Sequence, residues 1–483
     1  MQVQVSSTTE KKSLLILPVA FELLERSMCT TPSPGRRDSM IKRIIPFFAL
    51  TLLLINFIGC TTLSKQDAAG SAGVQPLWDA GSTRDKIIVV SDLHTGFEDA
   101  YAEILENRPY LIEFLQRIAV TSDVREVVLN GDILDEWFLP LSFVEIDRAD
   151  FYRKNIENNK DLVDAFKHVM DAGINLVYVV GNHDMSVNVQ YIEEAIPGMK
   201  VCSQHLGVGL YRTGDRNEIV IEHGHRYDVF SAPDTITNAH LTNGPTMFPP
   251  GYFYARFAAD WVLKGKPAYR ASLPVIETVP DRVNDPDQFG AYAYYRTMET
   301  VFKNITPTDG FGDKLLDMRI DGYNDTYSIQ DLYPVRNEQG EISAPVLFPN
   351  YQRTWDARQK ANGVRVKSSF SEAALGALDS KYFESQARTQ FEVDNAQSDT
   401  SVVIFGHTHV PLFYDYGNGH YYVNTGTWID HNTNYKEKDG SLLSRTFAVV
   451  TTGPSSTAID IYQYQKDGQL RDLKSQLIAD HEK

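Results

Sequence analysis

The stretch REVVLNGDILDEW (residues 125–137) decides the fold, because an apolar run ends abruptly in Gly131 and Asp132. A run of this length and composition is typical of a strand buried on both faces of a sheet. Four further apolar runs end in polar residues in the same way: KIIVVSD (86–92), INLVYVVGN (174–182), EIVIEHG (218–224) and SVVIFGH (401–407). The sequence therefore predicts five buried strands with polar residues at their carboxyl ends.

The polar residues form five short motifs. They are Asp92-x-His94, Gly131-Asp132, Gly181-Asn182-His183-Asp184, His223-Gly224-His225 and Gly406-His407-x-His409. In open α/β sheets a site lies outside the carboxyl ends of the strands, so loops distant in sequence can meet there. Carboxylate, imidazole and amide groups suit Mn, Fe, Zn or Co rather than a metal that prefers thiolate. A single such motif is usually a turn or a structural residue, but the ordered set predicts a two-metal centre.

This ordered set resembles the motifs of the calcineurin-like metallophosphoesterase superfamily. The resemblance covers about residues 86–464 but not the segment between roughly 226 and 400. It implies two divalent ions (Mn, Fe or Zn) that share one bridging carboxylate, Asp132. By the same resemblance, the first ion would be held by Asp92, His94, Asp132 and His409, and the second by Asp132, Asn182, His223 and His407.

The resemblance also implies an enzyme, a hydrolase of phosphoric esters. Two divalent ions bind a phosphoryl oxygen and lower the pKa of a water, so that hydroxide can attack at neutral pH. His183 is then expected to stabilise the transition state or to protonate the leaving oxygen, with Asp184 or Asp135 setting its tautomer. We take His183 and Asp184 as the catalytic pair. His225 and Asp228 are either groups that support the metal ligands or residues of a solvated loop.

The order of predicted elements indicates an α/β fold. Amphipathic stretches such as residues 100–118 alternate with the first strands, whereas after Gly406 the pattern contains strands alone. We therefore expect a four-layer α/β/β/α sandwich, with residues 85–225 as its first part and 401–483 as its second.

Residues 226–400 are expected to form a large, mostly helical insertion that acts as a cap, because they lie between two ligand loops. Its many aromatic residues are interpreted as helix core. Four arginines of this segment are candidates for a phosphate clamp, since guanidinium pairs with phosphate through two hydrogen bonds. These are Arg256, Arg270, Arg296 and Arg353.

The amino-terminal region predicts export. Residues 40–59 read as a lipoprotein signal peptide, in which a basic start precedes the apolar run IIPFFALTLLLINFI and Gly59 precedes Cys60. The alternative is a transmembrane anchor. We expect residues 1–39 to be a non-native extension, Cys60 to carry the lipid, and residues 60–84 to form a flexible tether. The protein would then face the periplasm of a bacterial cell envelope, with the outer membrane favoured.

Composition narrows the class of partner. The chain has a net charge of −17, which argues against binding to nucleic acid through charge. We expect a small-molecule or lipid-linked phosphate ester as substrate. Residues 131–137 and 421–428 look most like the UDP-2,3-diacylglucosamine hydrolase branch, so a pyrophosphatase of that type is one alternative. A catalytically inactive metal-binding lipoprotein is another.

Overall fold

The computed structural model describes residues 73–145, 147–242, 244, 246–267, 273–304, 310–394 and 399–481. The expected extension, signal peptide and lipid-bearing Cys60 lie outside these residues. Val74–Lys483 form one compact unit. Part of the expected tether is docked on it: Leu77 is buried, and its N–H donates to Thr121 Oγ1 at 3.0 Å. Trp78 Nε1 donates to Asp123 Oδ1 at 2.9 Å. The segment around Leu77 therefore belongs to the folded unit and corrects the predicted end of the tether.

Seven strands form the first sheet, in the order β16-β15-β14-β1-β2-β3-β4. Strands β1 to β4 pair in parallel, whereas β14, β15 and β16 add antiparallel neighbours beside β1. The strands are β1 (Lys86–Val90), β2 (Val124–Asn130), β3 (Asn175–Val179), β4 (Lys200–Cys202), β14 (Thr446–Thr452), β15 (Thr457–Tyr464) and β16 (Leu470–Asp472).

Five strands form the second sheet, in the order β12-β13-β11-β6-β5. Its centre is parallel, since β11 pairs with both β6 and β13 in that sense. The strands are β5 (Leu210–Thr213), β6 (Ile219–Glu222), β11 (Val402–Phe405), β12 (Leu412–Gly417) and β13 (His420–Asn424).

The two sheets pack face to face. Successive side chains of a strand point to opposite faces, and in β1 Ile87 and Val89 enter the core between the sheets while Ile88 and Val90 face helices. Ile221 of β6 and Ile404 of β11 enter the same inter-sheet core.

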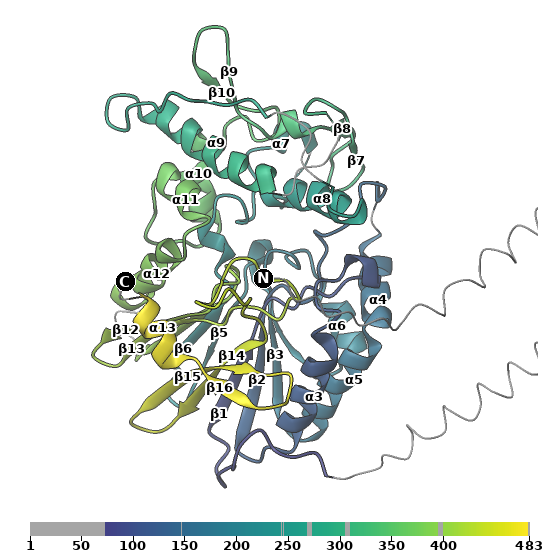
Figure 1. The fold of residues 1–483 in the computed structure, drawn as a ribbon, viewed down its shortest axis with the longest axis vertical. Coiled ribbons are helices and arrows are strands. Elements are labelled where there is room, and N and C mark those ends of the chain that lie inside the picture. Colours follow the sequence, from purple (N-terminus) through teal and green to yellow (C-terminus); the bar gives the residue numbers. More distant parts are fainter. Residues whose placement is uncertain are drawn as a thin grey trace, which may run out of the picture. The chain divides into compact units, whose positions relative to one another are not determined.

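Helices cover both outer faces (Figure 1). The first sheet is covered by α3 (Arg108–Ala119), α4 (Arg148–Asn158), α5 (Lys160–Asp171) and α6 (Val189–Ala195). On the second sheet, Phe383 and Ala387 of α12 (Ser380–Thr389) pack on Val403 and Phe405 of β11. The predicted α/β/β/α sandwich is confirmed.

The insertion has a core of its own. Its helices are α7 (Ala239–Thr242), α8 (Pro250–Leu263), α9 (Pro286–Asn304), α10 (Tyr351–Ala361) and α11 (Phe370–Gly376), and its two small ribbons are β7 (Leu316–Met318) with β8 (Asp325–Tyr327) and β9 (Val335–Arg336) with β10 (Ile342–Ser343). Aromatic residues dominate this core, as the interpretation of the aromatic stripes requires: Tyr252 and Phe253 of α8 and Tyr294 and Tyr295 of α9 are buried in the same cluster.

Three details differ from the sequence predictions. Helix α3 begins at Arg108 rather than near residue 100, because Pro109 suits a first helical turn. The carboxyl-terminal part also contains a helix, α13 (Lys474–His481), whose Leu477 packs in the inter-sheet core. The end of the predicted insertion, α12 followed by the π-helical turn η6 (Gln390–Asp394), belongs to the sandwich.

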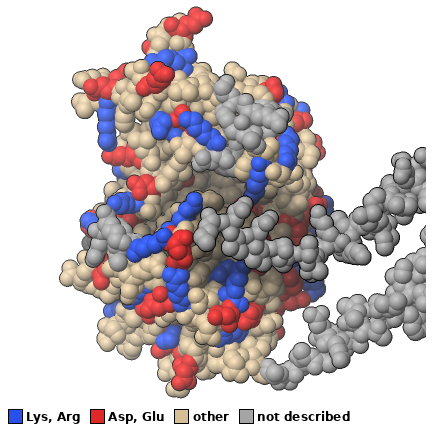
Figure 2. Space-filling model, viewed as in Figure 1, with Lys and Arg blue, Asp and Glu red and all other residues tan. Residues whose placement is uncertain are grey.

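On the face seen in Figure 2, acidic and basic side chains are interspersed rather than separated by sign.

Candidate metal centre

Strand register brings the five motif loops to one end of the sandwich. In the first sheet Val90 pairs with Leu129, and Asn130 pairs with Val179, so the loops that follow β1, β2 and β3 emerge side by side. In the second sheet Ile404 pairs with Ile221, which places His407 beside His223. Hydrogen bonds then join neighbouring loops, as where His94 N donates to Asp132 O at 2.9 Å.

Five motif residues other than glycine have a left-handed backbone. These are Asp92 (φ 55°), His94 (φ 48°), Asp132 (φ 55°), His407 (φ 72°) and His409 (φ 58°). This region is sparsely populated by residues other than glycine, and residues held there tend to cluster at functional sites. The strained turns redirect the chain directly after each strand, so that consecutive polar side chains point into one site.

Glycines of the motifs make room for these side chains. Gly131 has φ +84°, and a Cβ atom at this position would lie 2.4 Å from Nδ1 of His223. A Cβ atom on Gly406 would lie 2.7 Å from Oδ2 of Asp92. The glycines are therefore required by the close approach of the ligand side chains.

Gly131→Ala is expected to destabilise the fold through this contact. Gly340→Ala is the matched control, because Gly340 has φ +83° and no described atom within 4 Å of the added Cβ. The left-handed backbone alone should lower the free energy of unfolding by about 1–2 kcal/mol in both variants. Overpacking should cost Gly131→Ala about 1–3 kcal/mol more. Urea unfolding measures the difference, and equal midpoints would contradict the prediction.

The first group of candidate ligands is Asp92, His94, Asp132 and His409, which offer atoms within 4.8 Å of one another. His409 Nε2 lies 3.2 Å from Asp92 Oδ1. The Nε2 atoms of His94 and His409 face each other at 3.1 Å. Two imidazole nitrogens this close need a proton or a cation between or beside them, since their lone pairs would otherwise repel.

The second group shares Asp132 with the first and adds His223 and His407. His223 Nε2 is buried and has no hydrogen-bond partner in the described part of the chain, and it lies 3.1 Å from Asp132 Oδ2. Its other nitrogen, Nδ1, lies 2.8 Å from the Asn130 carbonyl oxygen, which orients the ring. Asn182 joins this group, since its Oδ1 lies 2.9 Å from His407 Nδ1. An orphaned buried nitrogen facing a carboxylate fits a cation site.

The groups are strongly coupled electrostatically. Burial opposes the charged form of His223, but the Asp132 and Asp92 carboxylates outweigh it and raise the pKa of His223 to about 9. Burial likewise opposes ionisation of Asp132, yet the imidazoles of His223 and His183 hold the pKa of Asp132 well below its ordinary value. The neighbouring carboxylates thus stabilise positive charge in the site. Protons on the imidazoles supply this charge when no metal ion is bound.

His183 lies beside the two groups with its side chain partly exposed. Its Nδ1 contacts Asp135 Oδ1 at 2.8 Å, and the other oxygen of Asp135 contacts His94 Nδ1 at 2.8 Å. Burial opposes protonation of His183, but the Asp135 carboxylate outweighs it and raises the pKa of His183. Asp135 therefore orients the His183 imidazole through Nδ1, and no hydrogen bond joins Nε2 to another described residue.

Asp184 does not contact His183 through its carboxylate, which corrects the predicted catalytic pair. Its oxygens accept from Gly181 N at 2.6 Å, from Ile133 N at 2.7 Å and from the Tyr178 hydroxyl at 2.5 Å. Burial raises the pKa of Asp184 to about 6. Asp184 joins the loops after β2 and β3, because a buried carboxylate must satisfy its oxygens with nearby donors.

The stretch 421–428 supports the site from behind. Thr427 Oγ1 donates to the Asp92 carbonyl oxygen at 2.9 Å, and Asn424 Nδ2 donates to the Gly406 carbonyl oxygen at 2.6 Å. These bonds hold the turns that carry Asp92 and His407.

Two residues left open by the sequence have different surroundings. Asp228 Oδ2 lies 3.3 Å from His407 Nε2, so this carboxylate supports a candidate ligand from outside. The His225 ring is buried 5.6 Å from the ring of His223, and neither of its nitrogens has a hydrogen-bond partner among the described residues. Burial, together with His223 and His407, holds the pKa of His225 well below its usual range.

The predicted arginine clamp is not formed by Arg256, which is fully buried and donates to backbone carbonyls of residues 139–143. Arg296 pairs with Glu299 on its own helix, Arg353 is exposed, and Arg270 lies outside the described residues. Sequence reasoning missed Trp137, whose ring centroid lies 4.6 Å from that of His183. Its place directly after GDILDE was the available signal.

Comparison with known proteins agrees with this geometry. Residues 85–264 match the calcineurin-like phosphoesterase family. The chain contains a calcineurin-like phosphoesterase domain. It is a hydrolase that acts on phosphoric ester bonds, and the family together with the Asp/His clusters indicates a dinuclear site for divalent metals.

Other comparisons add little to the phosphoesterase assignment. No curated protein matches the sequence significantly. Among solved structures, the chain is similar to a dimetal phosphatase from Danio rerio (9% identity, TM-score 0.29, covering 78% of this chain and 95% of that one). It is also similar to GAP50, the anchor in the inner membrane complex of Plasmodium (10% identity, TM-score 0.27, covering 80% and 88%).

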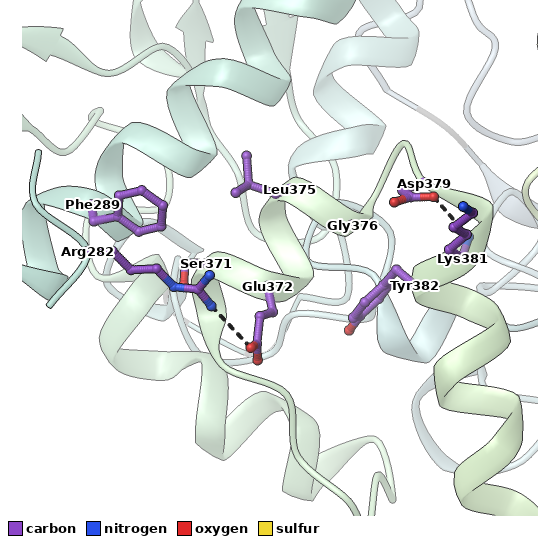
Figure 3. Close-up of a pocket in the computed structure, with 9 residues that line it drawn as sticks. All are labelled: Arg282, Phe289, Ser371, Glu372, Leu375, Gly376, Asp379, Lys381 and Tyr382. Carbon is purple, nitrogen blue, oxygen red and sulfur yellow. Dashed lines mark hydrogen bonds and ion pairs between the residues drawn. The ribbon is translucent and has the colours of Figure 1, made fainter. Parts of the chain in front are cut away.

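A pocket of about 340 Å³ lies away from these ligands, between α9, α11 and α12 (Figure 3). Arg282 Nη2 donates to Glu372 Oε1 at 3.2 Å at one end of it, and Tyr382 lies at the other. None of the candidate metal ligands lines this pocket.

Proposed function

We propose that this phosphoesterase hydrolyses a phosphate mono- or diester with two divalent ions and the seven residues that sequence analysis named as ligands. The observation that carries the proposal is that Asp132 belongs to both clusters, as a bridging carboxylate must. When bound, two such ions polarise the phosphoryl oxygen and lower the pKa of an attacking water. His183 is placed to hold a proton for the leaving oxygen, because Asp135 fixes its Nδ1.

The first test concerns how many metal ions the protein binds and whether hydrolysis depends on them. Protein purified without chelator and offered Mn or Zn should contain about two divalent ions per chain, the stoichiometry of a two-metal centre. Removal of the ions with a chelator should abolish hydrolysis of p-nitrophenyl phosphate and of bis(p-nitrophenyl) phosphate, and restored ions should return it. Elemental analysis gives the stoichiometry. Fewer than one ion per chain would refute the site.

The substrate proposal keeps two candidates. A small or lipid-linked phosphate ester is favoured by the expected export, while the UDP-2,3-diacylglucosamine type is favoured by the motifs at residues 131–137 and 421–428. A panel of mono-, di- and pyrophosphate esters, run with several divalent ions, separates them. Hydrolysis of none of these esters by metal-loaded protein would favour the inactive metal-binding scaffold.

We also propose that the protein is held at the bacterial envelope by lipid on Cys60. The support is the sequence of residues 40–60, which lie outside the described part of the structure. Among the described residues, no helix combines the length and apolar character needed to cross a bilayer. In a bacterial host, mass spectrometry of the mature wild-type protein is expected to find Cys60 as the first residue with lipid attached, and Cys60→Ala is expected to carry no lipid and to keep residues 40–59. A wild type that keeps residues 40–59 would favour the transmembrane anchor instead.

A further inference from the structure

The loop after β2 is held by the insertion through a buried arginine. Arg256 of α8 donates from Nε to Leu139 O at 3.1 Å, and from Nη2 to Pro140 O at 2.9 Å and to Phe143 O at 2.6 Å. Its remaining terminal nitrogen donates to the Tyr252 hydroxyl at 2.8 Å. A planar guanidinium suits such a fan of carbonyl oxygens, and an ammonium cannot match it. Arg256 therefore fastens residues 139–143 to the insertion.

A chain of ion pairs also connects this loop to the insertion. Arg148 lies 3.0 Å from Glu136 Oε1 through Nε and 2.7 Å from Asp321 Oδ1 through Nη2. Glu136 belongs to the loop and is buried, whereas Asp321 belongs to the turn between β7 and β8 of the insertion. Close by, Arg319 N donates to Val144 O at 2.9 Å.

Both groups that orient His183 lie on this loop. The Asp135 oxygen that contacts His183 also accepts from Trp137 N and Phe138 N, each at 2.8 Å. The Trp137 ring packs against His183 on one side and meets the Tyr252 ring edge to face on the other, with centroids 6.1 Å apart. A Cβ atom on Gly251 would lie 3.0 Å from the Trp137 ring, so α8 lies directly against it.

Asp132 is held differently, although it starts the same loop. Its carbonyl oxygen accepts from Leu93 N and from His94 N, both at 2.9 Å, and these donors belong to the loop after β1. The Asp132 backbone is thus held by the sandwich. The loop that orients His183 is held by both parts, because Asp135 N donates to Thr95 O at 3.0 Å, while Leu139, Pro140, Phe143 and Val144 accept from the insertion.

We propose that the insertion positions His183: Arg256 and the Asp321–Arg148–Glu136 chain hold residues 135–143, which keep the His183 imidazole aimed at the leaving oxygen. Arg256 and Asp321 are positioning residues that act through the loop. The proposal rests on the proposed function, since it assigns the insertion a part in that reaction. Its signature is a dependence on the leaving group, because a misplaced acid slows the loss of a poorly leaving alkoxide more than that of a nitrophenolate.

The experiment compares Arg256→Lys and Asp321→Asn with matched controls in the same insertion, Arg296→Lys and Asp317→Asn. Asp321→Asn keeps the size of the side chain, and the φ of 51° at residue 321 is one that asparagine adopts readily. This variant therefore tests the proposal even if Arg256→Lys does not fold. Rates are measured on p-nitrophenyl phosphate and glycerol phosphate, or on the corresponding diesters, at saturating metal. We expect the alkyl rate to fall at least tenfold more than the aryl rate in the test variants, with unchanged metal content, and both rates to stay at the wild-type level in the controls.

Hydrogen exchange supplies a readout that needs no turnover. Amides of Trp137 and Phe138 should exchange faster in Asp321→Asn and Arg256→Lys than in wild type or the controls. Unchanged exchange, or an equal fall of alkyl and aryl rates, would overturn the inference while leaving the proposed function intact. A metal-loaded wild type that hydrolyses neither ester would overturn the proposed function itself.

Discussion

Asp132→Asn is expected to lose both metal ions and nearly all activity. One carboxylate serves both clusters, with His223 Nε2 at 3.1 Å and His94 Nε2 at 3.8 Å from the same oxygen. An amide has one oxygen in place of two and carries no charge to offset two cations. The loss of metal affinity should therefore exceed the roughly 10–100-fold that follows loss of an outer partner of a ligand. Elemental analysis and hydrolysis of p-nitrophenyl phosphate measure the two effects.

The control for Asp132→Asn lies at the opposite end of the same strand. Asp123, just before β2, is buried and accepts hydrogen bonds from Trp78 and Gly81. Asp123→Asn should retain both ions even if it lowers stability. Full metal content in folded Asp132→Asn would show that this residue does not bridge.

His183→Ala is expected to lower kcat by about 10²–10⁴, the usual contribution of a positioned acid or base, while both ions stay bound. The replacement keeps the hydrogen bond that Asp132 Oδ1 accepts from the backbone N–H of His183 at 2.8 Å. The His183 ring packs 4.7 Å from the ring of His94, which keeps its own contact with Asp135 Oδ2 at 2.8 Å. The loss should be larger for an alkyl ester than for a nitrophenyl ester. Rates at saturating substrate, together with elemental analysis, test this result.

His168→Ala is the control for His183→Ala, because His168 is an exposed histidine of α5 remote from the motif loops. It should behave as wild type. Unchanged turnover in His183→Ala would remove this residue from the mechanism, and loss of the ions in the same variant would make it a structural support.

The structure changes the expected result of removing the insertion. If residues 226–400 were only a cap, a short linker in their place would leave metals and the hydrolysis of small esters intact. However, Phe383 and Ala387 cover the outer face of the second sheet, and the Phe383 ring lies 5.4 Å from that of His407. Deletion of residues 226–400 would therefore also remove α12, which covers the outer face of the second sheet. A deletion that tests the cap must end before α12.

The sequence alone was enough to predict the sandwich and to name the candidate ligands that the fold brings together. Apolar runs such as residues 86–90 are local patterns that specify buried strands, and the residue that follows a strand must emerge at the edge of the sheet. The type of each side chain also determines which metal ions it can bind. The order and composition of the motifs are therefore enough to predict that Asp92, Asp132 and His223 lie together.

Only the tertiary structure decided which neighbour each polar side chain uses. Asp135 and Asp184 are both candidate partners of His183 in the sequence, but the left-handed turn at Asp132 directs Asp135 to the imidazole, whereas Asp184 turns back to backbone donors. The sequence made Arg256 a candidate for a phosphate clamp. In the fold its guanidinium donates hydrogen bonds to backbone carbonyl oxygens instead. Hydrogen-bond partners depend on the path of distant loops, and no local pattern encodes that path.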